Sequence, residues 1–223
     1  MENQLPVWRR VLVVVAHPDD ESFGLGGVIG RLVDDGAEVD VLCLTAGEAS
    51  TLGAAPDLAR TRALELEAAA ELLGCRTTAL LGHPDGGLRG REDELFADIE
   101  RAIDATAPDG LLVFAVEGGV TGHPDHEAAS RAAIAVAAGR GLRVLEWGLP
   151  EEVAGALRSE FGGGFTGHDE GSLPIVVEVD RTRQVAAAHL HVSQAVPGSV
   201  LWRRLELLGD REHLRLTPAA PLA

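Results

Sequence analysis

Two short segments concentrate side chains that could bind a metal ion and move protons. Residues 16–21 read AHPDDE, and residues 122–127 read GHPDHE. Imidazole and carboxylate groups are the usual nitrogen and oxygen ligands of zinc and similar divalent ions. His17 and Asp20 are three residues apart across a turn, which is close enough for both to bind one ion. The carboxylate of Asp19, between them, is expected to point elsewhere and stay free.

A free carboxylate beside such an ion can accept a proton from water. For the first segment alone, an exposed acidic turn would be the simpler interpretation. The second segment reverses that preference because it supplies further imidazoles far along the chain. Two histidines and one carboxylate would leave one coordination position open, as in catalytic zinc sites. The sequence therefore predicts a catalytic metal centre built from both segments.

Both segments follow apolar runs that are typical of buried parallel strands. Residues 11–15 read VLVVV, and residues 111–115 read LLVFA. In open α/β sheets, ligands bind at the carboxyl ends of such strands. Pro18 disfavours helical backbone at His17, and Pro124 suits the first position of a following helix. The two segments are therefore expected to converge at one edge of a parallel sheet.

The paired motifs resemble those of the LmbE/PIG-L family of metal-dependent de-N-acetylases. That family includes deacetylases and amidases of mycothiol and bacillithiol metabolism. The resemblance rests on residues 17–21 and 122–126 and extends over most of the chain. It implies an α/β fold, a Rossmann-like three-layer sandwich with a mostly parallel central sheet, as a single domain over residues 1–223. It also implies a zinc ion, with iron or manganese as alternatives for this ligand set.

The resemblance also assigns roles to residues of the two motifs. The implied metal ligands are His17, Asp20 and His126. Asp19 would be the general base. His123 would be the acid or the group that stabilises the oxyanion, and Asp125 would orient His123.

Substrate contacts are predicted at three further positions. Arg62 matches a family landmark, a helical arginine that contacts the substrate. Glu48 follows the predicted strand 39–45, and Asp85 lies in the loop 82–87, which contains a third His-Pro-Asp. That third motif lacks a following acid or histidine and is a poor chelator. A solvated loop acid for Glu48 and a surface ion pair for Arg62 remain the alternatives.

One position departs from the family pattern. Some sugar deacetylases of the family carry a mobile tyrosine two residues before the acid histidine. This chain has Thr121 there and contains no tyrosine. Oxyanion stabilisation by that phenol must therefore be absent or supplied by another group.

The spacing of apolar residues predicts the elements that support the site. Helices are expected from residue 24 to about 35 and at residues 59–73, 92–106, 128–138, 151–161, 181–192 and 201–208. Further strands are expected at residues 39–45, 78–81, 143–147 and 175–179. Residues 50–58 and the glycine-rich stretch 162–168 are predicted loops.

Composition excludes several classes of partner. The 223 residues carry a formal net charge of −16. An acidic surface argues against binding to nucleic acid or an anionic membrane. No apolar run approaches the length of a membrane span, and residues 1–10 show no signal-peptide pattern. We therefore expect a cytoplasmic protein, which could form a homo-oligomer.

The predicted activity is hydrolysis of an N-acylated amino sugar or related small-molecule amide, giving acetate and a free amine. Amidase action on a thiol conjugate, or hydrolysis of an ester or phosphoester, would use the same residues. A non-catalytic sugar- or nucleotide-binding module is a third possibility. A dinucleotide loop is disfavoured because Ile29 stands where the Gly-x-Gly-x-x-Gly pattern needs its last glycine.

Overall fold

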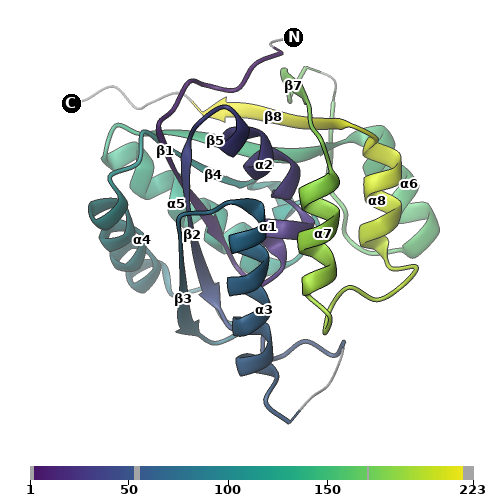
Figure 1. Cartoon of the computed structure of the whole chain (residues 1–223), viewed down its shortest axis with the longest axis horizontal. Coiled ribbons are helices and arrows are strands. Elements are labelled where there is room, and N and C mark those ends of the chain that lie inside the picture. Colours follow the sequence, from purple (N-terminus) through teal and green to yellow (C-terminus); the bar gives the residue numbers. More distant parts are fainter. Residues whose placement is uncertain (1–2, 53–55, 170, 218–223) are drawn as a thin grey trace.

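The computed structural model describes residues 3–52, 56–169 and 171–217. Within these residues the chain folds around one eight-stranded sheet that lies between two layers of helices (Figure 1). The predicted α/β sandwich with a mostly parallel central sheet is confirmed. Residues 53–55, which belong to the predicted loop 50–58, lie outside the described residues.

The sheet is parallel through its centre and antiparallel at one side. Its strands run in the order β3-β2-β1-β4-β5-β8-β7, and β6 pairs with β5 off this path. The parallel strands are β1 (Arg10–Val15), β2 (Glu38–Thr45), β3 (Thr77–His83), β4 (Gly110–Phe114), β5 (Arg143–Pro150) and β6 (Gly167–His168). The antiparallel strands are β7 (Ile175–Glu178) and β8 (Arg211–Thr217).

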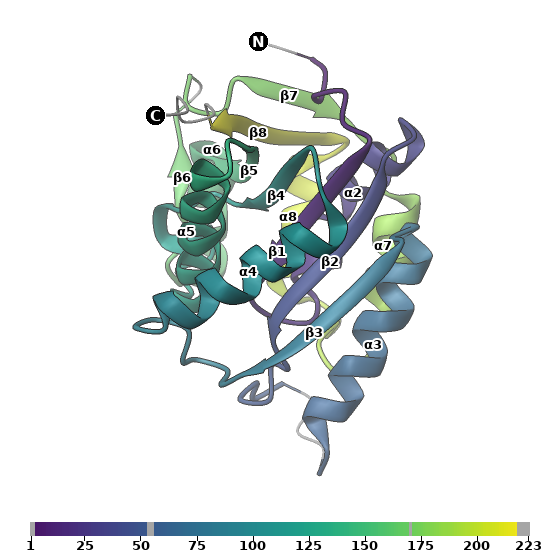
Figure 2. The ribbon, with the colours of Figure 1, turned by 90° about the vertical axis from the view of Figure 1, so that its left-hand side faces the viewer.

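Helices cover both faces of the sheet (Figure 2). One face is covered by α2 (Gly26–Asp34), α3 (Leu58–Leu73) and α7 (Thr182–Leu190). The opposite face is covered by α4 (Glu92–Thr106) and α5 (Pro124–Gly139). The short α1 (Asp20–Phe23) follows β1, a 3-10 turn (Glu117–Gly119) follows β4, and α6 (Glu151–Phe161) packs against α8 (Val200–Leu208).

Strand β1 contributes side chains to both hydrophobic cores. Val11 and Val13 belong to the core on the α2 and α3 side, whereas Leu12 and Val14 belong to the core on the α4 and α5 side. Successive side chains of a strand point to opposite faces of its sheet. A strand that is covered on both faces must therefore be apolar throughout, which explains the unbroken VLVVV run.

The order of the strands fixes where a ligand can bind. The chain passes from β1 to β2 and β3 on one side of the sheet and then returns to β4 on the other side of β1. Such a reversal opens a crevice at the carboxyl ends of the two strands that flank it. The AHPDDE segment follows β1 and the GHPDHE segment follows β4, so both lie at this crevice.

Several local details differ from the sequence-based expectations. Residues 20–23 form a short helix that was not predicted, and β3 is longer than the predicted strand 78–81. On α3, the sequence places Leu64, Ala68 and Leu72 at a four-residue repeat that predicts a buried face, but Leu64 is 59% exposed and Leu66 is buried instead. Residues 167–168, expected within a loop, form strand β6. Within the described residues, no helix combines the length and the apolar character that crossing a membrane requires.

Candidate active site

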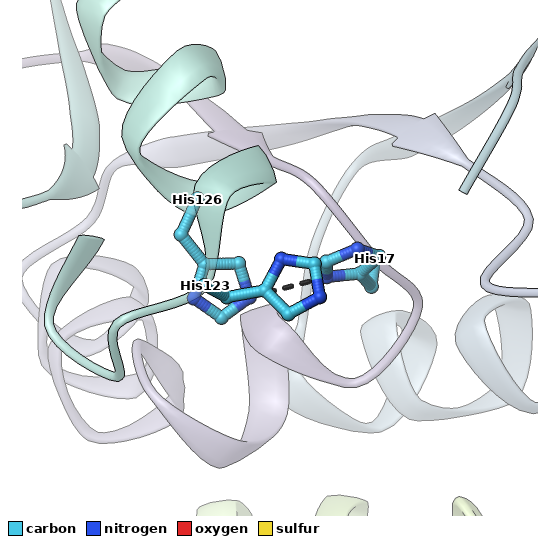
Figure 3. A group of neighbouring side chains, drawn as sticks. All are labelled: His17, His123 and His126. Carbon is cyan, nitrogen blue, oxygen red and sulfur yellow. Dashed lines mark hydrogen bonds between the residues drawn. The ribbon is translucent and has the colours of Figure 1, made fainter. Parts of the chain in front are cut away.

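The three predicted ligands meet at the crevice. His17 Nδ1 lies 3.1 Å from His126 Nε2, and the latter atom lies 3.1 Å from Asp20 Oδ1. His17 Nδ1 is 3.6 Å from Asp20 Oδ2. All three side chains are buried. Figure 3 shows the two imidazoles reaching toward each other, one from the loop after β1 and the other from α5.

These separations suit a shared metal ion. Donor atoms held about 2.0–2.1 Å from one tetrahedral ion lie about 3.3–3.4 Å from one another. His126 Nε2 is 3.1 Å from both His17 Nδ1 and Asp20 Oδ1, whereas the 3.6 Å separation from His17 Nδ1 is to the other Asp20 oxygen, Oδ2. Two imidazole nitrogens and a carboxylate oxygen also form a donor set that zinc, iron or manganese accepts.

Contacts of the His126 Nδ1 atom favour the tautomer whose Nε2 lone pair could bind a metal ion. Its other nitrogen, Nδ1, lies 3.1 Å from the carbonyl oxygen of Gly119 and 3.0 Å from Thr121 Oγ1. An Nδ1–H that donates to the Gly119 carbonyl leaves a lone pair on Nε2, directed at His17 and Asp20. Thr121, which stands where some sugar deacetylases of the resembled family carry a mobile tyrosine, therefore contacts a predicted ligand. The sequence marked this position as unusual but gave no sign of that contact.

His17 is surrounded by carboxylates on its other side. Its Nε2 atom lies 3.1 Å from Asp85 Oδ1 and 3.5 Å from Asp125 Oδ2, without an aligned hydrogen bond among the described residues. Burial alone would lower the pKa of His17, but Asp125, Asp20 and Asp85 raise it to about 12. The site thus favours positive charge at this position, which a bound cation would also supply.

The Asp125 carboxylate, predicted to orient His123, faces other groups in the structure. Its carboxylate accepts hydrogen bonds from the backbone N–H groups of Gly86 and Leu88, at 2.7 and 3.1 Å, and faces His17. The contact with His123 is made instead by the Asp125 backbone N–H, which donates to His123 Nδ1 over 3.2 Å. The carboxylate is turned away because it lies in the first turn of α5, against the loop after β3.

His123 lies beside the cluster and is less buried than the ligands. Its ring centroid is 4.6 Å from that of His17 and 5.1 Å from that of His126. Burial is the largest cause that lowers the pKa of His123 below its ordinary value. The imidazole is therefore neutral near pH 7 and is available as a hydrogen-bonding group. The ligand atoms of the three histidines lie within 4.8 Å of one another.

Asp19 is paired rather than free. Its carboxylate lies 3.0 Å from Arg62 Nη2. Burial raises the pKa of Asp19 to about 6, against the lowering effect of Arg62. Its backbone has a φ of 121°, an unusual value for a residue other than glycine. Its N–H donates to Glu21 Oε2 over 2.9 Å, which helps to hold this strained conformation beside the predicted ligands.

Backbone carbonyl groups hold the Arg62 side chain in place. It is only 3% exposed, and it donates to the carbonyl oxygens of Gly47, at 2.7 Å, and of Pro18. A side chain on Gly47 would collide with the guanidinium, and the φ of 63° at that residue also favours glycine. Arg62 thereby fixes Asp19 and the loops after β1 and β2. It also lines the cavity, so the predicted substrate contact stays a prediction.

The crevice encloses a cavity of about 390 Å³. Its lining includes the predicted ligands, Asp19, His123 and Asp85, and it is closed on one side by the start of α8. This volume is within the range of small-molecule sites. Glu48 is exposed, is not part of the lining, and accepts a hydrogen bond from the Asp85 N–H at 2.9 Å. Of the third motif, Asp85 lies at the cavity, whereas His83 lies apart from the ligand cluster and its Nε2 atom is 2.6 Å from Asp98 Oδ2.

A buried ion pair anchors the AHPDDE loop to α7. His191, at the end of α7, lies 2.7 Å from Glu21 Oε1, and both side chains are completely buried. Glu21 keeps the pKa of His191 above its ordinary value although burial opposes this. His191 does not line the cavity. Its contact with Glu21 instead supports the segment that carries Asp19 and Asp20.

Replacing His191 with alanine should lower the free energy of unfolding by about 3–5 kcal/mol, because it leaves the Glu21 carboxylate buried without its partner. Denaturant unfolding measures this change. The neighbouring Val192 is 79% exposed, so Val192→Ala is the matched control and should stay within about 0.5 kcal/mol of the parent. A loss below about 1 kcal/mol in His191→Ala would show that this pair does not anchor the loop.

Residues 12–137 match the protein-family model named PIG-L and described as GlcNAc-PI de-N-acetylase. The chain belongs to this family. The match covers β1 through α5 and thus includes every residue predicted for the site. Within the family segment, the two motifs occupy the crevice between β1 and β4. The elements from β5 to β8, including α8, lie outside it.

Curated relatives of this PIG-L protein are named as sugar deacetylases. A 1D-myo-inositol 2-acetamido-2-deoxy-alpha-D-glucopyranoside deacetylase of Kineococcus radiotolerans is 33% identical, over 93% of this chain and 77% of its own. A probable N-acetyl-alpha-D-glucosaminyl L-malate deacetylase 2 of Bacillus cereus is 35% identical over 56% of this chain. That match covers 60% of the Bacillus cereus protein's own length.

Solved structures share the fold of this PIG-L protein. N,N'-diacetylchitobiose deacetylase from Pyrococcus horikoshii superposes with a TM-score of 0.66 at 23% identity, over 97% of this chain and 88% of its own. The 4-carboxy-2-hydroxymuconate hydratase of Pseudomonas putida has a TM-score of 0.69 at 18% identity, over 96% and 99% of the two chains. Because a deacetylase and a hydratase both share this fold, the fold alone does not specify the reaction.

Proposed function

We propose that the protein is a zinc-dependent hydrolase that removes the acetyl group from an N-acetylated amino sugar, giving acetate and a free amine. The observation that carries this proposal is the close approach of His17, Asp20 and His126, with Asp19 beside them, in a member of the PIG-L family. The names of its relatives support the sugar as substrate. Iron or manganese would suit the same donor set.

A divalent ion held by His17, Asp20 and His126 would supply Lewis-acid chemistry, since such an ion acidifies water and polarises a carbonyl oxygen. The residues around it provide the rest. Asp19 is positioned by Arg62 to take the proton of the attacking water. With a pKa of about 6, the carboxyl can then release that proton to the departing amine nitrogen.

The remaining groups would orient the substrate and the site. His123 is placed to hydrogen-bond the oxygen on which negative charge develops. Asp125 and Asp85 stabilise His17 from the side opposite to the predicted ion. Arg62, Glu48 and Asp85 as substrate contacts, a cytoplasmic location and a homo-oligomer remain predictions from the sequence.

Acetate release from a panel of amides tests the proposal. The metal-loaded protein should release acetate from N-acetylglucosaminides, and the rate should exceed that on thiol-conjugated amides of similar size. Faster cleavage of the conjugates would favour the amidase alternative. Heat of binding to the same glycosides without any acetate release would favour the non-catalytic binding module.

A further inference from the structure

Arg204 is a buried cation on the wall of the cavity. It lies on α8, outside the family segment, and is 7% exposed. The cavity lining includes Arg204 and the start of the same helix, Ser199, Val200 and Leu201. Its guanidinium carbon lies 5.4 Å from the centroid of the Trp147 ring. The guanidinium thus sits between a core aromatic ring and the cavity.

No carboxylate neutralises Arg204 within the described residues. Its Nη2 donates to the backbone carbonyl of Phe23, and its Nε has no hydrogen-bond partner there. Glu212 is the acid whose charge favours it most, but the Glu212 carboxylate is already bound by Trp147 Nε1 at 2.6 Å and by Arg181 Nη1 at 2.5 Å. Arg204 is therefore a buried guanidinium without an ion-pair partner of its own.

Such an arrangement needs a physical explanation. Buried charges in proteins are normally paired, because removing them from water is costly. Burial lowers the pKa of Arg204 to about 10, so it still carries its charge at neutral pH. Arg62, the other buried arginine in this cavity, has Asp19 as its partner. The Nε atoms of both arginines have no hydrogen-bond partner among the described residues, but Arg204, unlike Arg62, has no carboxylate paired with it there.

We propose that Arg204 binds a carboxylate group on the substrate, so that the site selects N-acetylated amino sugars whose aglycone is anionic. This inference rests on the proposed deacetylase function and specifies its substrate class. Ser199 also lines this wall, and its buried hydroxyl has no hydrogen-bond partner among the described residues.

The charges in the cavity also define how such a substrate lies. The end near the predicted metal ligands carries Asp19, Asp20 and Asp85, which would repel an anion. Arg204 provides the compensating positive charge on the α8 wall. A substrate with its acetamide at His17 and His126 would therefore direct its carboxylate toward α8. Hydrogen bonds between charged groups are about twice as strong as neutral ones, so the contact should be visible in the kinetics.

The test compares two glycosides of N-acetylglucosamine that differ only in charge, the methyl and the carboxymethyl glycoside. Metal-loaded parent protein should show a kcat/KM for the carboxymethyl glycoside that is about 10- to 100-fold higher. Arg204→Gln should reduce that ratio to near one, through KM rather than kcat, and Arg204→Lys should restore part of it. The matched control is Arg203→Gln, since Arg203 is paired with Glu160 and Glu206. It should keep the full ratio.

A merely structural role of Arg204 would lower kcat/KM for both glycosides equally and leave their ratio unchanged. That result, or a ratio near one in the parent protein, overturns the inference. Calorimetric binding of the two deacetylated glycosides separates this failure from failure of the proposed function. Tighter binding of the carboxymethyl product, lost in Arg204→Gln, would support the anion site even if neither acetylated glycoside were hydrolysed. Equal binding of both products would refute it.

Discussion

Asp19→Asn should lower kcat by about 10²–10⁴-fold and leave the metal content of the protein unchanged. The amide cannot accept a proton from water, but it keeps the shape of the side chain. Asp19 is not one of the three converging ligand residues, and its carboxylate pairs with Arg62 instead. Steady-state acetate release and elemental analysis of the same preparation measure both effects.

The matched control for Asp19→Asn is Asp35→Asn, which removes a carboxylate from an exposed i,i+4 pair with Arg31. It should retain the turnover of the parent protein. If Asp19→Asn keeps parental turnover with a full complement of metal, Asp19 is not the general base. If it loses the metal, Asp19 belongs to the ligand set, and the roles of Asp19 and Asp20 must be exchanged.

His126→Ala should release the metal and abolish acetate production together. Loss of a hydrogen-bond partner of a metal ligand already weakens metal affinity about 10–100-fold, and loss of the ligand itself should exceed this. The Nε2 atom of His126 lies 3.1 Å from atoms of both other predicted ligands, so its removal opens the centre of the cluster. Metal titration of metal-free protein gives the affinity directly.

His83→Ala is the corresponding control for His126→Ala. His83 also belongs to a His-Pro-Asp motif, but it contacts Asp98 and not the cluster. It should therefore bind metal as the parent protein does. Unchanged metal affinity in His126→Ala, or loss of affinity in His83→Ala, would contradict the assigned ligand set.

The meeting of the two motifs could be predicted from the sequence because local pattern and sheet geometry are sufficient for it. The VLVVV run had to be a buried strand, and neighbouring parallel strands present their carboxyl ends at one edge. His17 and His126 follow two such strands, so their meeting required no knowledge of the loops. The structure shows β1 and β4 paired in this way.

Side-chain partners set by long-range contacts could not be predicted in this way. The Asp125 carboxylate turns to Gly86 and Leu88 because the loop after β3 crosses the start of α5. Asp19 pairs with Arg62 because α3 brings that guanidinium to the end of β1. Neither contact can be inferred from the spacing of residues along the sequence.

The last third of the chain was the least predictable part of the site. Arg204 lies in a helix with ordinary amphipathic spacing and no motif, so nothing in the sequence distinguished it from Arg203. Its burial follows from the packing of α8 against α6 and from its position over Trp147. The antiparallel pairing of β8 with β5 and β7 likewise depends on tertiary contacts rather than on local pattern.

The most direct test is to titrate the metal-free protein with zinc while measuring acetate release from an N-acetylglucosaminide. If His17, Asp20 and His126 hold one catalytic ion, activity should be absent without metal and should rise until about one ion is bound per chain. Full acetate release by the metal-free protein would contradict a metal centre at this crevice.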